Sequence, residues 1–339
     1  MASLAWFRQS RVNPLRELRV NLEKLDRRPG LILKSANRIL SALKVKNISG
    51  LSIERLLAVF DLDFSEPNPN ALIDKSLNLL FVSTNKDFKM LPLSIEGGFY
   101  STPNFREVFA TVIVPDDQVA ECRSILSELQ EKLPIEILPE SSIVPDKYLD
   151  DLKIKFGWRF GWVLQQILKT KFSTDSEYDF VLIIDSDTVL LRKRNWVLEN
   201  GKQLLTPSWE YNPSYYRFLN TQGLFPLHPK YTFVSHHMLT QPNLFKKATQ
   251  MLGWNNLDNM VKTLVEYDSD GEISPFCIEY ELYGQYMYLF ESESCFLEKW
   301  GNTSVPAQIL LEFSSYEDIR EKYALSLASV SAHSYLSVE

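Results

Sequence analysis

The chain has 339 residues, of which 45% are hydrophobic and 12% aromatic, and its formal net charge is −7. This composition is ample for a packed core and excludes a globally disordered chain. The three cysteines lie far apart in the sequence with no CxxC pair, so the sequence suggests neither a disulfide framework nor a zinc site, and a reducing compartment is the natural expectation. No apolar run suits a signal peptide or a membrane-spanning helix, so we expect a cytoplasmic protein.

The first 60 residues predict a basic, amphipathic helical extension. Residues 1–50 carry eleven basic and three acidic side chains, and their leucines recur at helical spacing. We expect residues 8–46 to contact an anionic membrane surface on the inner face of the membrane, to dock on the acidic remainder of the chain, or to bind a partner. Nucleic acid is not an expected partner, because the basic stretch has few interleaved aromatic residues and the rest of the chain is acidic.

Residues 61–76 are rich in Asp, Asn and Pro and predict a linker, so the main domain is expected over 77–339. Strands and helices alternate from there. The predicted strands cover 77–84, 108–114, 135–138 and 181–184, and the predicted helices fall within 86–99, 120–133 and 156–171. This alternation predicts an α/β domain whose sheet is mixed but mostly parallel and is flanked by helices.

The strongest functional signal follows the apolar run Val181–Ile184, which leads directly into Asp185 and Asp187. An unbroken aliphatic run predicts a strand buried on both faces, so the two carboxylates emerge at the carboxyl edge of the sheet. Open α/β sheets bind their ligands at that edge. Two hard oxygen ligands suit Mg²⁺ or Mn²⁺ held against substrate phosphates. The DxD motif therefore predicts a metal–phosphate site.

Two other functions fit the same motif. Haloacid-dehalogenase-like phosphatases also place D-x-D-x-[TV] after an apolar strand, and Asp185, Asp187 and Val189 match that pattern. That motif normally opens its domain, however, whereas more than half of this chain precedes it. A non-catalytic binding module that keeps the fold is the third hypothesis.

A candidate general base lies further along the chain. Ser274 and Pro275 predict the start of a helix, which places Glu279 in its first two turns among aromatic residues. A carboxylate in such a partly desolvated place can have a raised pKa and act as a base, or it can simply stabilise the helix start. Glu281 lies about 200° further around the helix and is expected on the surface.

Other candidate contacts come from three segments. On the predicted helix 156–171, Arg159, Gln166 and Lys169 share one face and can contact a phosphate-bearing substrate or be solvated surface residues. His236 and His237 follow a predicted strand over 231–234, where neighbouring residues face opposite sides, so at most one imidazole reaches a given site. The aromatic segment that starts at Trp209 can serve as a stacking platform for a sugar or pack as an ordinary loop.

The order of these motifs resembles the GT-A fold of nucleotide-sugar-dependent glycosyltransferases. More closely, four blocks resemble a group of bacterial glycosyltransferase-like proteins that are often associated with surface polysaccharide. The resemblance covers about residues 77–336. The blocks are Asn85-Lys86-Asp87 with Leu91–Ile95, Arg159–Lys169, Phe233–Met238 and Glu279–Gly284. The resemblance implies a Rossmann-like GT-A domain and leaves the basic N-terminal extension unexplained.

The resemblance also implies site roles. The cofactor would be Mn²⁺ or Mg²⁺, with Asp187 as a direct ligand, Asp185 on the ribose or on the metal through water, and His333 as a third ligand. The donor would be a nucleoside-diphosphate sugar, most simply a UDP- or GDP-sugar, for a hexosyltransferase reaction, and the acceptor a saccharide or a lipid-linked molecule. Glu279 would be the base if the reaction inverts configuration. The remaining expected donor contacts are Thr84, Asp87, Arg159, Gln166 and Lys169, and the expected acceptor contacts are Trp209, His236, His237 and Tyr283.

Overall fold

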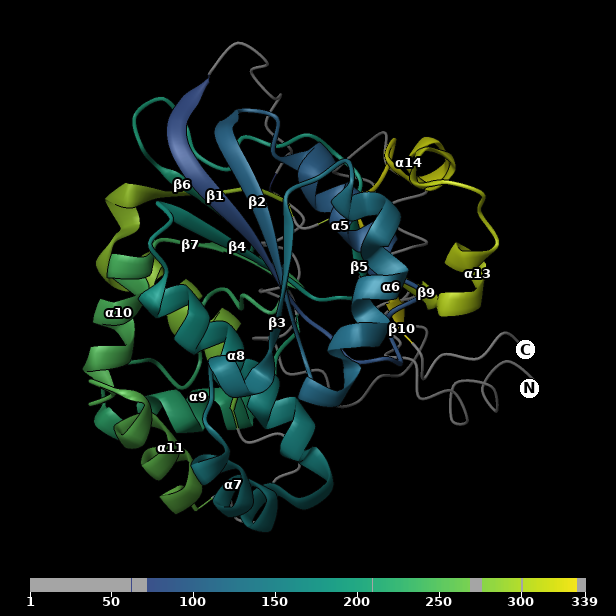
Figure 1. The fold of residues 1–339 in the computed structure, drawn as a ribbon. Coiled ribbons are helices and arrows are strands. Elements are labelled where there is room, and N and C mark those ends of the chain that lie inside the picture. The colour runs from purple at the N-terminus through teal and green to yellow at the C-terminus, as the bar shows by residue number, and fades with distance from the viewer. Residues whose placement is uncertain (1–61, 63–71, 209, 269–275, 300, 334–339) are drawn as a thin grey trace, which may run out of the picture. The chain divides into compact units, whose positions relative to one another are not determined.

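The computed structural model describes residues 62, 72–208, 210–268, 276–299 and 301–333 (Figure 1). The predicted N-terminal extension, most of the linker, Trp209 and the predicted helix start at Ser274 and Pro275 lie outside the described residues. Within the described part of the chain, no helix is both long and apolar enough to cross a bilayer.

The main sheet of the described residues has five strands in the order β3-β2-β1-β4-β7. The first four are parallel to one another, and β7 runs antiparallel to β4 at the edge. The strands are β1 (Ile73–Val82), β2 (Phe105–Val114), β3 (Ile135–Pro139), β4 (Phe180–Ile184) and β7 (His237–Thr240). The mostly parallel mixed sheet is therefore confirmed. Strand β1 begins at Ile73, within the segment predicted as linker, since its first residues pair with β2.

Helices cover both faces of this sheet (Figure 1). Along β1, Leu79 and Phe81 pack with residues of α5 and α6, whereas Leu80 and Val82 pack with residues of α8 and α10. This alternation follows from the two-residue period of a strand. The covering helices are α5 (Leu91–Ser101) and α6 (Val119–Gln130) on one face, and α8 (Phe160–Asp175) and α10 (Pro242–Met251) on the other. The sheet is thus the central layer of three.

The predicted single helix over 156–171 is wrong in its first turn. Helix α7 (Leu149–Phe156) ends there, a short 3₁₀ turn covers Gly157–Arg159, and α8 begins at Phe160. Gly157 has a φ of +52°, which favours glycine and interrupts the helix. Arg159 therefore precedes α8 and does not share a helical face with Gln166 and Lys169.

The second half of the chain adds helices and two small sheets in the orders β5-β10-β9 and β6-β8. Their strands are β5 (Thr188–Leu190), β6 (Gln203–Leu205), β8 (Cys295–Leu297), β9 (Asn302–Pro306) and β10 (Ser329–His333). The helices are α9 (Pro213–Leu219), α11 (Leu257–Glu266), a π-helical turn (Ile278–Leu282), α12 (Tyr283–Phe290), α13 (Ala307–Leu311) and α14 (Tyr316–Tyr323). Strand β10 pairs antiparallel with β5, so the end of the chain returns to the segment that follows the DxD motif.

Helix α12 makes a close contact that only glycine permits. A Cβ added at Gly284 would lie 2.4–2.6 Å from three atoms of the buried Phe233 side chain. We expect Gly284→Ala to lower the free energy of unfolding by about 1–3 kcal/mol, because overpacking outweighs the helix propensity that alanine gains. Chemical denaturation measures this. Gly161→Ala on α8 is the matched control, since its Cβ meets no atom within 4 Å and should leave stability unchanged or slightly raised. Equal stability of the two variants would contradict the prediction.

Candidate functional site

The DxD motif lies at the carboxyl end of the central strand β4, as the sequence predicts. All of β4 is buried, and the chain leaves the sheet at Asp185 and enters β5 at Thr188. Asp185 and Asp187 are partly exposed, whereas Ser186 between them is buried. The backbone carbonyl of Ser186 accepts a hydrogen bond of 2.9 Å from Ser94 Oγ on α5. The turn that carries both carboxylates is therefore fixed to the first covering helix.

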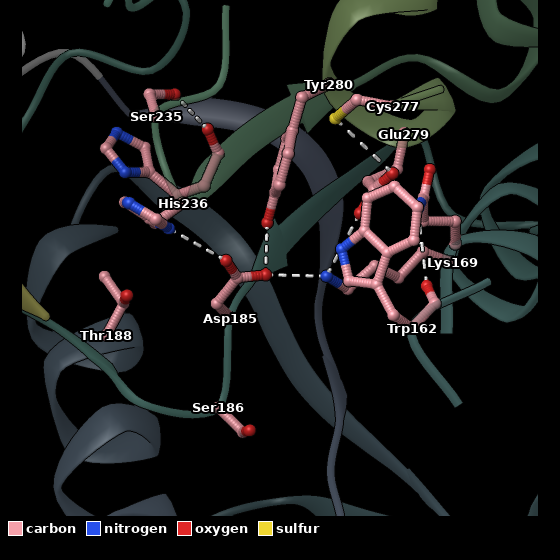
Figure 2. Close-up of polar contacts among 12 residues, drawn as sticks. Trp162, Lys169, Asp185, Ser186, Thr188, Ser235, His236, Cys277, Glu279 and Tyr280 are labelled. Carbon is pink, nitrogen blue, oxygen red and sulfur yellow. Dashed lines mark hydrogen bonds and ion pairs between the residues drawn. The ribbon is translucent and has the colours of Figure 1, made fainter. Parts of the chain in front are cut away.

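Asp185 has protein partners on both of its oxygens (Figure 2). Its Oδ1 accepts hydrogen bonds from Lys169 Nζ at 2.6 Å and from the Tyr280 hydroxyl at 2.5 Å, and its Oδ2 lies 3.0 Å from His236 Nδ1. Burial alone would raise the pKa of this carboxyl, but Lys169 and His236 outweigh it and hold the pKa well below its usual range. Asp185 is thus a fixed anion.

Lys169 lies between two carboxylates in the protein interior. Its side chain is 1% exposed, and its Nζ lies 2.6 Å from Asp185 Oδ1 and 3.5 Å from Glu279 Oε1. Burial disfavours the charged amine, yet the two carboxylates raise its pKa above the ordinary value. Burial raises the pKa of Glu279, against the effect of Lys169. Lys169 therefore links the DxD motif to the π-helical turn.

The two histidines point in different directions, as predicted. The strand that positions them is β7, which begins at His237, and not the predicted strand over 231–234. His236 has a φ of +63°, and its carbonyl accepts the Asp185 N–H at 3.0 Å. Burial opposes its protonation, but Asp185 and Glu210 raise its pKa; Glu210 Oε1 lies 3.9 Å from His236 Nε2. Of this pair of histidines, His236 is the one whose imidazole reaches Asp185.

His237 lies on the other side of β7. Its Nε2 is 3.1 Å from an Arg194 nitrogen, and its ring packs edge-on against Trp196. Burial and the charge of Arg194 lower the pKa of His237 well below its usual value. The predicted acceptor contact through this residue is not brought to the DxD motif, because the side chain is enclosed in the core.

Asp87 lies beside the motif. It follows the end of β1, and its Oδ2 accepts a hydrogen bond of 3.3 Å from Ser186 Oγ. Burial, with Asp187 nearby, raises its pKa despite the neighbouring Lys86. The carbonyl of Thr84 accepts the Asp87 N–H at 2.9 Å, so Thr84 borders the same edge. The structure thus brings the predicted contacts from β1 and β4 together.

Three other predicted contacts lie elsewhere. Gln166 is buried, and its Oε1 accepts the Ile278 N–H at 2.9 Å, so it joins α8 to the π-helical turn. Tyr283 is also fully buried, with its hydroxyl 2.8 Å from Gln203 Oε1. The Arg159 guanidinium lies over the rings of Trp158 and Trp162. The structure gives Gln166 and Tyr283 roles in packing, and we leave both out of the site.

The expectation that Glu281 lies on the surface is wrong. It is fully buried, with Oε1 accepting the Phe233 N–H at 2.7 Å and Oε2 accepting Gln285 Nε2 at 3.0 Å. Burial raises its pKa to about 7. Sequence reasoning also missed Tyr280 as a partner of Asp185. The available sequence signal is that Tyr280 lies in the block Glu279–Gly284, one of the four that carry the family resemblance. In the structure this block begins with a π-helical turn, a feature frequent at functional sites.

Asp185 and Asp187 differ in how well each could bind a hard divalent cation. Both Asp185 oxygens accept hydrogen bonds from the protein, which makes Asp185 poorly suited to bind a cation directly, and Asp187 is the other, partly exposed carboxylate of the motif. The Ala332 N–H donates to the Asp187 carbonyl at 2.7 Å, which places the backbone of His333 beside the motif. The His333 side chain lies outside what the structure describes. Among the described side chains, no group of three or more His, Cys, Asp or Glu is arranged to hold a metal ion.

Residues 99–300 match the profile of a family described as a family of unknown function (DUF6492). The chain belongs to this family. No curated protein matches the chain significantly. The group of surface-polysaccharide proteins named above therefore stays a predicted resemblance.

Among solved structures, the mannosyltransferase Ktr4p from S. cerevisiae in complex with GDP is similar at 11% identity and a TM-score of 0.50, over 81% of this chain and 89% of that one. The apo form of mouse xyloside xylosyltransferase 1 has 11% identity and a TM-score of 0.43, over 78% and 100%. The galactosyltransferase LgtC with donor and acceptor sugar analogs has 12% identity and a TM-score of 0.44, over 76% and 87%. At these identities the likeness concerns the fold, and the fold of this chain is GT-A.

Proposed function

We propose that this protein is a metal-dependent glycosyltransferase that moves a sugar from a nucleoside-diphosphate donor to a saccharide or lipid-linked acceptor. The observation that carries the proposal is the DxD motif at the carboxyl end of β4, beside Asp87 from the end of β1, in a GT-A sheet. Ligands of open α/β sheets bind at this edge. The GDP complex of Ktr4p supports a nucleoside diphosphate as the donor's leaving group.

In this proposal, Asp187 and His333 would hold Mn²⁺ or Mg²⁺. The cation would supply positive charge against the departing diphosphate. Asp185 would be an outer contact, toward the ribose or toward a water on the cation, because Lys169, Tyr280 and His236 hold its oxygens. Lys169 is then a positioning residue for Asp185 and not a direct phosphate contact, since its amine is enclosed between carboxylates.

The two ends of the proposed substrate complex have different surroundings. Thr84 and Asp87 would border the nucleotide base, where Asp87 would accept a hydrogen bond from the imide of uracil or guanine. His236 and Glu210 would border the acceptor, with Trp209 next to Glu210 in the sequence. Glu279 fits the base of an inverting reaction by its raised pKa, whereas its burial fits a role in fixing Lys169. A retaining reaction would need no such base.

The phosphatase hypothesis is less well supported. It requires a carboxylate oxygen of Asp185 to attack phosphorus, but Lys169, Tyr280 and His236 occupy both oxygens. The hypothesis of a non-catalytic binding module differs in what it predicts for Asp187, because a silent site would tolerate loss of that carboxylate.

Thermal denaturation tests the proposal and predicts a specific ligand. With Mn²⁺ and one of UDP, GDP, CMP or ADP at about a hundredfold excess over its dissociation constant, we expect the melting temperature to rise by roughly 5–10 °C. Asp187→Asn should abolish this rise, since it removes the direct cation ligand. The exposed Asp117→Asn is the matched control and should keep it.

Turnover then separates the hypotheses. Release of the nucleoside diphosphate from its sugar conjugate, lost in Asp187→Asn, is the expected result. Hydrolysis of a phosphomonoester without any nucleotide effect would instead support the phosphatase. A biological phenotype that survives Asp187→Asn would support the binding module.

A further inference from the structure

Residues 152–162, here called the basic aromatic segment, combine cations with large aromatic residues. The sequence Leu152-Lys153-Ile154-Lys155-Phe156-Gly157-Trp158-Arg159-Phe160-Gly161-Trp162 contains three cations, four aromatic residues and no acidic residue. The whole chain, by contrast, has a net charge of −7. The segment covers the end of α7, the 3₁₀ turn and the first residues of α8.

Two large apolar side chains of the segment are exposed. Ile154 is 83% exposed and Trp158 is 78% exposed, and among the described large hydrophobic residues only Leu325, at 90%, is more exposed. Single exposed apolar residues are common, but an exposed Trp and Ile four residues apart are not expected on a surface that contacts water alone. The positive φ of Gly157 lets the chain turn between them.

The three cations of the segment are the sequence neighbours of Ile154 and Trp158, which are together called the apolar tip. The Arg159 guanidinium lies 4.7 Å from the centroid of a Trp158 ring, and Lys153 Nζ lies 5.4 Å from the Phe160 centroid. Lys155 is exposed between Ile154 and Trp158. The nearest acidic residues in the sequence, Asp150 and Asp151, belong to the first turn of α7, and Asp151 lies four residues, about one helical turn, before Lys155. The surface of this segment therefore combines exposed apolar side chains with positive charge.

The segment borders the candidate site. Helix α8 leads directly into β4, and its Lys169 contacts Asp185 at the end of β4, so the start of α8 lies nine residues, about 14 Å along the helix, beyond that contact. The ring of Trp162 stacks on Phe276, with 6.0 Å between centroids, and Phe276 precedes the turn that carries Glu279. Figure 2 shows Trp162 and Lys169 in the same close-up as Asp185.

We propose that the basic aromatic segment binds an anionic lipid membrane surface. Trp158 and Ile154 insert at the boundary between headgroups and acyl chains, where tryptophan is favoured. Lys153, Lys155 and Arg159 contact the lipid phosphates. This combination of cations and exposed apolar groups matches an anionic bilayer better than a protein surface. The proposal does not depend on catalysis.

Flotation of the full chain with vesicles tests it. We expect binding to phosphatidylcholine vesicles that contain phosphatidylglycerol and at least about tenfold weaker binding to vesicles of phosphatidylcholine alone. Ile154→Ser with Trp158→Ser should weaken binding to the anionic vesicles by at least about tenfold. Lys153→Gln and Lys155→Gln should each weaken it by about fivefold.

Control variants at other exposed positions test whether vesicle binding depends on the basic aromatic segment. Leu325→Ser removes a more exposed apolar group, and Lys262→Gln removes a lysine whose side chain is 72% exposed, so neither should change vesicle binding. Circular dichroism checks that all variants fold. Unchanged binding by the Ile154→Ser, Trp158→Ser double variant would overturn the proposal and assign any membrane contact to other residues, such as 8–46. Absence of binding by the wild type, or a change of oligomeric state in place of vesicle binding, would also overturn it.

Discussion

Replacing Lys169 with methionine is expected to lower the free energy of unfolding by about 3–5 kcal/mol. The side chain is 1% exposed, and its amine is the cation shared by Asp185 and Glu279. Methionine fills a similar volume but leaves these two carboxylates close together without that charge. Removing one partner of a buried ion pair is strongly destabilising, because an uncompensated charge remains in the interior. Replacing both partners by apolar residues, by contrast, often changes the stability little. Urea denaturation followed by circular dichroism measures the loss.

Lys171→Ala is the matched control for this variant. Lys171 lies two residues further along α8, and its ion pair with Asp175 is on the surface, so we expect a change below about 1 kcal/mol. Adding Asp185→Asn and Glu279→Gln to Lys169→Met removes the stranded charges and should restore much of the lost stability. A Lys169→Met protein as stable as the Lys171→Ala protein would show that the buried network does not hold the site together.

The sequence predicts the sheet and the position of the DxD motif because both depend on local patterns. The apolar run before Asp185 has the length and composition of a strand buried on both faces, and its polar end can only emerge at a sheet edge. The alternation of strands and helices then favours parallel pairing. These inferences need no knowledge of distant contacts, and the structure confirms them for β1 to β4.

The charged network around Asp185 depends on contacts that no local pattern contains. Lys169, His236 and Tyr280 come from three separate segments, and a lysine that neutralises an aspartate has the same sequence signal as one that binds phosphate. His236 reaches Asp185 through a backbone with positive φ, which strand alternation does not predict. For this reason the sequence identifies Lys169 as part of the site but assigns it a different partner.

Helical periodicity failed for Glu281 for another reason. The period gives the angle between two side chains, but it does not say whether both sides of a helix are covered. Here the π-helical turn is enclosed, and Glu281 accepts hydrogen bonds from Phe233 and Gln285 while Glu279 meets Lys169 on another side. Both carboxylates are therefore buried.

Glu281 should make the protein less stable as the pH rises. Burial raises its pKa from 4.5 to about 7 in the folded protein. Below pH 4.5 the carboxyl is protonated in both states. Between pH 4.5 and 7 the folded state holds the proton and the unfolded state does not, so each step up in pH favours unfolding. The free energy of unfolding therefore falls as the pH rises from about 4.5, the pKa in the unfolded chain, to about 7, the pKa in the folded protein. The total decrease is about 3 kcal/mol.

Glu281→Gln removes this titration while keeping a carbonyl oxygen that can accept the Phe233 N–H. We expect the unfolding free energy of the variant, measured by urea denaturation from pH 4 to 8, to gain about 3 kcal/mol relative to the wild type between the two ends of that range. Glu293→Gln is the control, since its side chain is 97% exposed and its removal should leave the pH profile of the wild type unchanged. Parallel profiles for wild type and Glu281→Gln would mean that the buried carboxyl titrates as it does in the unfolded chain. In that case the hydrogen bonds from Phe233 and Gln285 stabilise the ionised form enough to offset its burial, and the carboxyl would be charged in the folded protein at pH values above its ordinary pKa of 4.5.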